Sequence, residues 1–239
     1  MSRVKKVPSL SVFFPCFNEE GNVVQLIEQF AAVLPQVAHK YEVIVIDDGS
    51  TDGTLKRVKE QKKKYSFLRV VSHSKNKGYG ASLRSGFAAA KYEWTFFTDG
   101  DLQFDVKQLK EFIDWTPDYN VIIGYRLRRA EGSLRALNAR LFKVYIDLLF
   151  RLHVTDIDCA FKLIRTDILQ SLQLLSTGAF TSSELLYRLK KNGEEFKQLP
   201  VQHFNRTFGK PTGNSPKVIL KAGIEAFSLY VQMKFHHSI

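Results

Sequence analysis

Two aspartates separated by one glycine, Asp99-Gly100-Asp101, follow the apolar run WTFF at residues 94–97. A run of aromatic and β-branched residues predicts a strand buried on both faces, and Gly100 lets the chain turn tightly where that strand ends. The two carboxylates can then converge on one point, near the side-chain amide of Gln103. Such oxygen ligands suit Mg²⁺ or Mn²⁺ and leave positions open for substrate phosphates. Taken alone, the tripeptide is equally typical of a surface turn.

Acidic and polar residues also follow two earlier apolar runs, at residues 10–14 and 41–46. A helical apolar pattern succeeds each of them, and a third run at 67–71 leads through a glycine-containing loop into a helix at 81–90. Because strands and helices alternate, we predict an α/β fold with a mostly parallel, Rossmann-like sheet and helices on both faces. Ligands bind beyond the carboxyl ends of such strands. The acids expected on that rim are Glu19, Asp48, Asp99 and Asp101.

Basic residues and a second acidic pair come later in the chain. Arg126 follows a predicted strand at residues 120–124, and Asp156 and Asp158 precede another apolar segment. A helix is predicted at 105–115 and a strand at 196–204. The loop at 205–211 is basic and has the composition of a flexible segment, so it can close over bound phosphate.

Two long helices are predicted in the second half of the chain. The first runs from Ser133 to about Leu152, and its apolar residues are expected to form a buried stripe. These residues are Leu137, Leu141, Val144, Leu148 and Phe150. The second, at 216–235, is amphipathic, and it can lie on a membrane surface or pack on the domain or on a second subunit. We expect a catalytic domain over residues 1–212 and a C-terminal amphipathic helical segment over 213–239.

The composition permits a well-buried core and favours anionic partners. Of 239 residues 44% are hydrophobic, and 35 Lys and Arg against 24 Asp and Glu give a formal charge of +11. Nucleotides, lipid phosphates or nucleic acid would suit that charge. Cys16 and Cys159 have neither disulfide nor zinc spacing, which fits a reducing cytoplasm. We find no signal-peptide core and no charge-free run of roughly 18–20 residues, so we expect a cytoplasmic protein without a membrane span.

Three common classes of enzyme lack their motifs in this sequence. Gly78 and Gly80 follow the third predicted strand, but the third glycine of a dinucleotide fingerprint is replaced by Leu83. The sequence contains no P-loop and no Gly-x-Ser-x-Gly elbow, which excludes P-loop NTPases and argues against serine hydrolases. The acidic rim remains the coherent functional signal.

The chain resembles the family-2 glycosyltransferases of the GT-A fold over about residues 8–212, and specifically the polyprenyl-phosphate branch that includes dolichol-phosphate mannose synthase. The motifs that carry the resemblance are FPCFNEE at 14–20, VIDDGSTDGT at 45–54, the glycine-rich segment 76–86, DGDLQ at 99–103, and Asp156 with Phe161-Lys162. In two respects the chain departs from the family. It lacks the transmembrane helices of the membrane-embedded members, and the family's Gly-Phe-Arg is Ala160-Phe161-Lys162 here.

The resemblance implies a role for each motif. The residues that would hold base and ribose are Pro15, Phe17, Glu19 and Asp48, and those completing the nucleotide site are Asn18, Asp47, Lys77, Gly78, Asp99 and Gly100. The ligands implied for Mg²⁺ or Mn²⁺ on the donor diphosphate are Asp99, Asp101 and Gln103. The candidates for phosphate and acceptor contacts are Arg126, Arg135, Arg206 and Lys210. The catalytic candidates are Asp156 and Asp158.

We therefore expect an inverting, metal-dependent hexosyltransferase that uses a UDP- or GDP-sugar and a polyprenyl phosphate at the cytoplasmic membrane face. One alternative is a soluble glycosyltransferase acting on a sugar hydroxyl, and a weaker one is a non-catalytic anion- or nucleic-acid-binding protein, for which no motif appears. The acceptor decides what Asp156 must do. A hydroxyl needs a base, either Asp156 or Asp158, whereas a lipid phosphate is already anionic and needs Asp156 only to orient basic groups or the acceptor. The sequence leaves homo-oligomerisation open.

Overall fold

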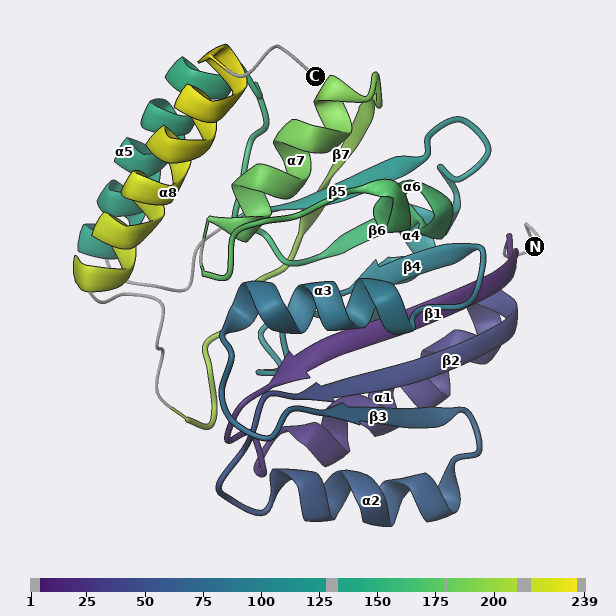
Figure 1. Ribbon diagram of the computed structural model, residues 1–239. Helices are drawn as coiled ribbons and strands as arrows, with labels where there is room; N and C mark the ends of the chain where they lie inside the picture. Colours follow the sequence, from purple (N-terminus) through teal and green to yellow (C-terminus); the bar gives the residue numbers. More distant parts are fainter. Residues whose placement is uncertain (1–4, 128–132, 179, 210–215, 236–239) are drawn as a thin grey trace.

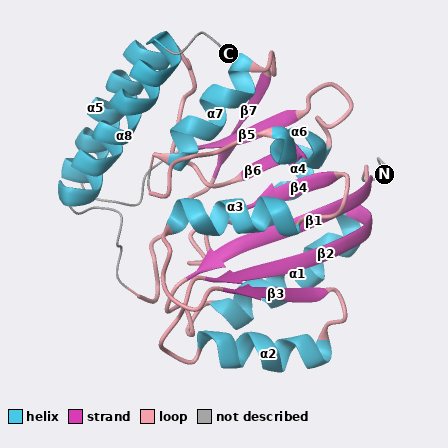
Figure 2. Cartoon of the chain, in the orientation of Figure 1, coloured by secondary structure: helices cyan, strands magenta, loops and turns pink. Residues whose placement is uncertain are grey.

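The computed structural model describes residues 5–127, 133–178, 180–209 and 216–235. These residues form a seven-stranded sheet with helices on both faces, in the order β3-β2-β1-β4-β6-β5-β7 (Figures 1 and 2). The strands are β1 (Val7–Cys16), β2 (Ala38–Asp47), β3 (Leu68–Ser72), β4 (Trp94–Phe97), β5 (Val121–Arg126), β6 (Lys162–Arg165) and β7 (Phe196–Val201). Neighbours pair in parallel except β6, which is antiparallel to β4 and β5. The predicted mostly parallel α/β sheet is confirmed.

Helices connect most of these strands. They are α1 (Val23–Val37), α2 (Thr54–Lys64), α3 (Tyr79–Ala89), the 3₁₀ turn η1 (Val106–Gln108), α4 (Leu109–Ile113), α5 (Ser133–Phe150), α6 (Thr166–Ser171), α7 (Thr181–Lys191) and α8 (Pro216–Phe235). The helix predicted at 105–115 is instead η1 followed by the short α4. Asp105 begins this turn, because its side chain accepts a hydrogen bond from Lys107 N (3.0 Å). The strand predicted at 196–204 is shorter and ends at Val201.

The sheet separates two apolar cores. Successive strand residues point to opposite faces, so Val12 and Phe14 of β1 pack with α1 and α4 on one side, while Phe13 packs with α3 and α7 on the other. All three side chains are fully buried. This arrangement explains why the strands read as continuous apolar runs. The carboxyl ends of the parallel strands lie along one edge, and that of β6 lies at the opposite edge.

Most of the apolar stripe that was predicted to be buried on helix α5 is exposed. The side chains of Leu141, Val144 and Leu148 are 60%, 61% and 78% exposed, while Ile146 and Phe150 are buried. Only Phe150 of the predicted stripe is confirmed as buried, and the side chain of Leu137 lies outside the described residues. The helix is apolar on more than one side, and helical spacing alone cannot show which side the domain covers.

Helix α8 packs beside α5 at the edge of the molecule (Figure 1). Tyr145 of α5 donates a hydrogen bond from its hydroxyl to Gly223 O (3.2 Å), and the ring of Phe150 lies 6.3 Å from that of Tyr230. The buried side chains of Ala222 and Ala226 join the core that also contains α3 and α7. The predicted C-terminal helix is thus present and packs on the domain. The proposed boundary at residue 212 falls outside the described residues.

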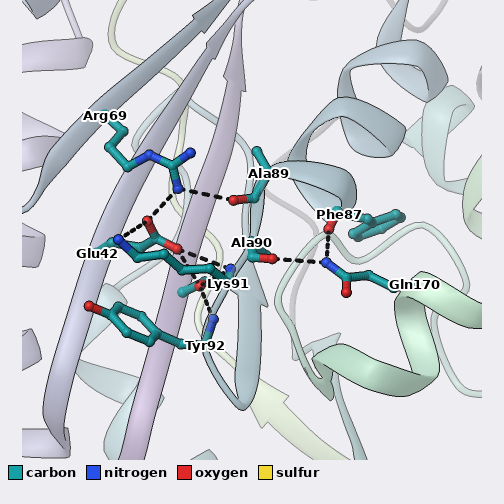
Figure 3. Close-up of polar contacts among 9 residues, drawn as sticks. Glu42, Arg69, Phe87, Ala89, Ala90, Lys91, Tyr92 and Gln170 are labelled. Atoms are coloured by element: carbon teal, nitrogen blue, oxygen red, sulfur yellow. Dashed lines mark hydrogen bonds and ion pairs between the residues drawn. The ribbon is translucent and has the colours of Figure 1, made fainter.

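Helix α3 is held at its carboxyl end by side chains from two other elements (Figure 3). Arg69 of β3 donates to Ala89 O (3.0 Å), and Gln170 of α6 donates to Phe87 O (2.9 Å) and Ala90 O (2.8 Å). These bonds satisfy carbonyls that the end of a helix leaves without partners. The buried carboxylate of Glu42 in turn holds the Arg69 guanidinium at 2.6 Å. The opposite end of α3 therefore has a fixed position at the edge where the candidate site lies.

Candidate active site

Asp99 and Asp101 leave the sheet at the end of β4, next to the end of β1. A Cβ atom on Gly100 would lie 2.6 Å from Pro15 O, so the close approach of the two segments requires glycine. Asp101 is buried and Asp99 is half-buried. Burial and the charge of Asp101 raise the pKa of Asp99 to about 7, although Arg126 opposes them. Two carboxylates are thus brought close together in a poorly solvated position.

This pair suits a divalent cation whose remaining ligands come from elsewhere. Carboxylate oxygens are the donors that Mg²⁺ and Mn²⁺ prefer, and a cation would relieve the repulsion between Asp99 and Asp101. Within the described ranges, no three His, Cys, Asp or Glu side chains are grouped so that they could hold a metal ion. Such a site would draw on Asp99 and Asp101, with Gln103 as the third predicted ligand, and would leave positions for phosphate oxygens and water.

The loop after β7 contacts the segment that carries Asp101 and Gln103. Gln103 exchanges two hydrogen bonds with Phe204, one from Phe204 N to Gln103 O (2.8 Å) and one from Gln103 Nε2 to Phe204 O (2.9 Å). Arg206 forms an ion pair with Glu19, and its Nη1 lies 3.6 Å from Asp101 Oδ2. The arginine predicted to contact phosphate therefore lies between two motifs that are predicted to bind donor nucleotide and metal. Lys210 of the same loop lies outside the described residues.

The loops after β1 and β2 are tied to each other. Asn18 has a left-handed φ of 58°, and its Oδ1 accepts a hydrogen bond from Thr51 N (2.8 Å). Glu19 N donates to Thr54 Oγ1 (2.8 Å). Burial raises the pKa of the Glu19 carboxyl, and the neighbouring Arg206 opposes this effect. These contacts bring two predicted nucleotide motifs together as one surface.

Other predicted nucleotide residues lie around this surface. Phe17 is 39% exposed, whereas Asp47 is buried and accepts hydrogen bonds from Ser72 Oγ (3.0 Å) and Ser50 N (3.3 Å). The Asp47 carboxylate therefore stabilises the loop that follows β2. Phe17 has the more accessible side chain and can stack on a base.

Asp48 is buried and uses its carboxylate inside the protein. It accepts hydrogen bonds from Lys77 N and Gly78 N, both at 2.9 Å, and its Oδ1 lies 2.6 Å from His73 Nδ1. The other ring nitrogen of His73 is hydrogen-bonded to Ser85 Oγ of α3 (2.9 Å). Asp48 thus fixes the backbone of the glycine-rich loop. These bonds join the motif that follows β2 to the glycine-rich segment.

Arg126 and Asp156 form a buried, two-pronged ion pair at the end of β5. Arg126 Nε lies 2.6 Å from Asp156 Oδ2, and Nη2 lies 2.9 Å from Oδ1. Burial alone would lower the pKa of Arg126, but the hydrogen bonds and charge of Asp156 raise it, with a smaller contribution from Asp158. Asp158 is exposed. Arg135 lies in the first turn of helix α5, but its side chain lies outside the described residues.

Lys162 is fully buried, near enough to this pair to be affected by the charge of Asp156. Its Nζ donates hydrogen bonds to the carbonyls of Ile157 (3.4 Å) and Cys159. Burial lowers its pKa, against the attraction of nearby groups that include Asp156. Lys162 thus supports the turn that carries Asp156 and Asp158.

The sequence motifs do not assign a role to two side chains of this region, Tyr79 and His73. Burial, together with the nearby charge of Asp99, raises the pKa of the Tyr79 hydroxyl well above its usual range. The signal for Tyr79 was its place between Gly78 and Gly80 at a strand's carboxyl end. The contact of His73 with Asp48 joins residues 25 positions apart and had no local signal.

Comparison with known proteins identifies relatives. The model of glycosyl transferase family 2 matches residues 11–173. Dodecaprenyl-phosphate galacturonate synthase of Rhizobium johnstonii is 33% identical over 126 residues, which are 52% of this chain and 37% of that protein. Dolichyl-phosphate beta-glucosyltransferase of Saccharomyces cerevisiae is 32% identical over 111 residues, 44% of this chain and 33% of that one. The chain spans less than half the length of the curated relatives it matches.

A solved structure supports the fold. Glucosyl-3-phosphoglycerate synthase from Mycobacterium tuberculosis, in complex with Mn²⁺, UDP and glucosyl-3-phosphoglycerate, aligns with a TM-score of 0.72 over 93% of this chain and 80% of that one. Sequence identity is 19%, so the likeness concerns the fold alone. Because the family model matches more than half of the chain and the sheet is that of its structural neighbours, the chain belongs to glycosyl transferase family 2 and has the GT-A fold.

Proposed function

We propose that this chain is the catalytic domain of an inverting glycosyltransferase that moves a hexose from a UDP- or GDP-sugar to a polyprenyl phosphate at the cytoplasmic face of a membrane. The names of two relatives specify polyprenyl-phosphate chemistry. The observation that carries the choice of acceptor is the Arg126–Asp156 pair, in which both carboxylate oxygens bind the guanidinium. A carboxylate engaged in this way is a poor general base, and a phosphate acceptor requires none.

In the proposed reaction an oxygen of the lipid phosphate attacks the anomeric carbon of the donor sugar. The bond from that carbon to the nucleoside diphosphate breaks on the opposite side, so the configuration inverts and no proton has to be removed. A divalent ion held by Asp99 and Asp101 would stabilise the negative charge that grows on the departing diphosphate. Arg126, held in place by Asp156, would bind the acceptor phosphate, and Arg206 would turn from Glu19 toward the donor phosphates.

The test is transfer of a labelled sugar. The chain is incubated with Mn²⁺, labelled UDP- or GDP-sugars, and undecaprenyl or dolichyl phosphate, and the organic phase is counted. We expect label in the organic phase with one donor, and loss of that label when EDTA is added. Absence of label with every donor would refute the lipid acceptor. Label on water-soluble oligosaccharides instead would support the hydroxyl-acceptor alternative, in which the exposed Asp158 would be the base.

A membrane acceptor needs a way for the chain to approach the bilayer. In the described part of the chain, no helix combines the length and the apolar character needed to span a membrane. Helices α5 and α8 nevertheless both carry exposed apolar side chains, which we call the α5–α8 face. Its members are Leu141, Val144, Leu148, Ile224 and Phe227, each 56–78% exposed.

We propose that this α5–α8 face lies on an anionic lipid surface, to which the formal charge of +11 attracts the chain. The test is co-sedimentation with vesicles of phosphatidylcholine containing phosphatidylglycerol. The double substitution Leu148→Gln and Phe227→Gln should weaken binding severalfold, whereas Leu175→Gln, at a 62% exposed leucine outside the face, should not. Dimers that the double substitution abolishes, without vesicle binding by wild type, would show that a second copy covers the face.

A further inference from the structure

His73 lies directly after β3, and its buried ring contacts both the loop after β2 and helix α3. Its backbone N donates a hydrogen bond to Asp47 O (2.9 Å), which continues the pairing of β3 with β2. In the ring, Nδ1 lies 2.6 Å from Asp48 Oδ1, and Nε2 lies 2.9 Å from Ser85 Oγ. Both ring nitrogens are engaged, so the orientation of the imidazole is fixed.

The partners of the ring determine where it carries its proton. An ionised carboxylate only accepts hydrogen bonds, so Nδ1 of His73 holds a hydrogen and donates it to Asp48. The Ser85 hydroxyl can donate or accept, and it therefore satisfies Nε2 whether or not that nitrogen carries a hydrogen. The connection from α3 through the ring to Asp48 is thus available in either charge state of the imidazole.

Helix α3 provides a rigid support behind the ring. Its carboxyl end is held by hydrogen bonds from Arg69 and Gln170 (Figure 3). Its middle is in close contact with β1, because a Cβ atom on Gly86 would lie 2.3 Å from the ring of Phe13. Ser85 precedes Gly86 in this helix, so the hydroxyl that contacts the imidazole comes from a backbone with little freedom to shift.

On its other side, the imidazole holds the carboxylate that shapes the glycine-rich loop. Asp48 Oδ1 accepts a hydrogen bond from Lys77 N, and Oδ2 accepts one from Gly78 N, both at 2.9 Å. The two loops also pack directly on each other, because a Cβ atom on Gly49 would lie 2.5 Å from the carbonyl carbon of Lys75. The direction of the Asp48 carboxylate therefore sets the shape of the surface that these loops share.

We infer that His73 is a positioning residue for the donor nucleotide, because its Nδ1–H holds the Asp48 carboxylate in the orientation that shapes the glycine-rich loop. The inference rests on the proposed use of a UDP- or GDP-sugar, for which both loops supply predicted nucleotide residues. The Arg126–Asp156 pair, proposed to bind the acceptor, belongs to other elements. Loss of the His73 contact should therefore weaken donor binding and leave acceptor binding unchanged.

Two substitutions separate the two hydrogen bonds of the ring. In His73→Asn the side-chain amide takes the place of Nδ1 and can still donate to Asp48. In His73→Gln the amide takes the place of Nε2 and reaches Ser85 instead. The Kd of UDP and of GDP is measured by isothermal titration calorimetry in the presence of Mg²⁺. For the nucleotide that wild type binds, the Kd should rise about tenfold in His73→Gln and only about threefold in His73→Asn.

Kinetics distinguish positioning from a general loss of structure. In His73→Gln the KM for the sugar nucleotide should rise about tenfold, while kcat and the KM for the lipid phosphate stay within about twofold of wild type. Ser85→Ala removes only the hydroxyl behind the ring and should raise the nucleotide Kd about threefold. His39→Gln is the matched control. His39 is exposed near the opposite end of β2, and its substitution should leave the Kd unchanged.

Three results decide the inference. Equal nucleotide Kd values in His73→Gln and His73→Asn would overturn it, as would a wild type that binds neither UDP nor GDP. If His73→Gln does not fold, Ser85→Ala decides, and an unchanged Kd in that variant overturns the inference. Failure of sugar transfer to lipid, with the expected tenfold rise in nucleotide Kd in His73→Gln, would refute the proposed acceptor and leave the inference standing.

Discussion

Replacing Asp156 with Asn removes the charge that faces Arg126 while keeping the size of the side chain. The side chains of Arg126 and Asp156 are 8% and 6% exposed, and two hydrogen bonds of 2.6 and 2.9 Å join them. Breaking a buried pair by removing one partner costs about 3–5 kcal/mol. Asn keeps an acceptor oxygen, and the charge of Asp158 lies close enough to affect Arg126, so we expect the lower value. The free energy of unfolding should fall by about 3 kcal/mol and the midpoint by about 6–12 °C.

Catalysis should suffer because Arg126 loses its orientation. A hydrogen bond to a charged group contributes about 1.5–3 kcal/mol, so kcat/KM for the lipid phosphate should fall about 10–100-fold. The assays are urea unfolding and initial rates of sugar transfer across a pH series. Asp167→Asn is the matched control, since its pair with Arg165 spans 3.1 Å with side chains 66% and 34% exposed. An exposed pair contributes at most about 1 kcal/mol, and this control should retain full activity.

Two results would refute this reasoning. If Asp156→Asn unfolds like the control, the buried pair does not hold Arg126 in the way its geometry implies. If the wild-type pH–rate profile has an acidic limb that vanishes in Asp156→Asn, with a loss of about 10²–10⁴-fold, Asp156 is a general base and the acceptor is a hydroxyl.

Three further predictions concern metal, acid and packing. Asp101→Asn should nearly abolish transfer with little change in the unfolding midpoint, and normal turnover with full Mn²⁺ dependence would place the metal elsewhere. Burial alone would raise the pKa of the Glu184 carboxyl, but hydrogen bonds from Ser176 and Leu175 make the net pKa lower than usual. The ionised carboxylate therefore stabilises the fold near neutral pH, and this contribution is lost as the pH falls through the lowered pKa. Glu184→Gln should therefore lower the free energy of unfolding at pH 7, but not at a pH below the pKa of Glu184 in the folded protein. If wild type and mutant differ in unfolding free energy by the same amount at both pH values, this prediction is wrong. Gly86→Ala should cost about 1–3 kcal/mol in urea unfolding through the Phe13 contact, and unchanged stability would show that the ring can move aside.

Local sequence determined the order of the elements and the acidic rim. The strand that carries Asp99 and Asp101 is recognisable because both its faces are buried, which makes it a continuous apolar run. The parallel sheet follows from the alternation of strands and helices, and it places Glu19 and Asp48 at the same edge. These features depend on neighbours in the sequence, so the sequence alone could predict them.

Tertiary structure decided what the rim residues contact and which helix face is buried. Arg206 pairs with Glu19 across 187 positions, and His73 contacts Asp48 across 25 positions. Helical spacing marked an apolar stripe on α5 but could not show that the domain buries Ile146 and leaves Leu148 exposed. The physical reason is the same in each case: periodicity and composition describe one segment, whereas burial and ion pairing depend on segments that are far away in the sequence.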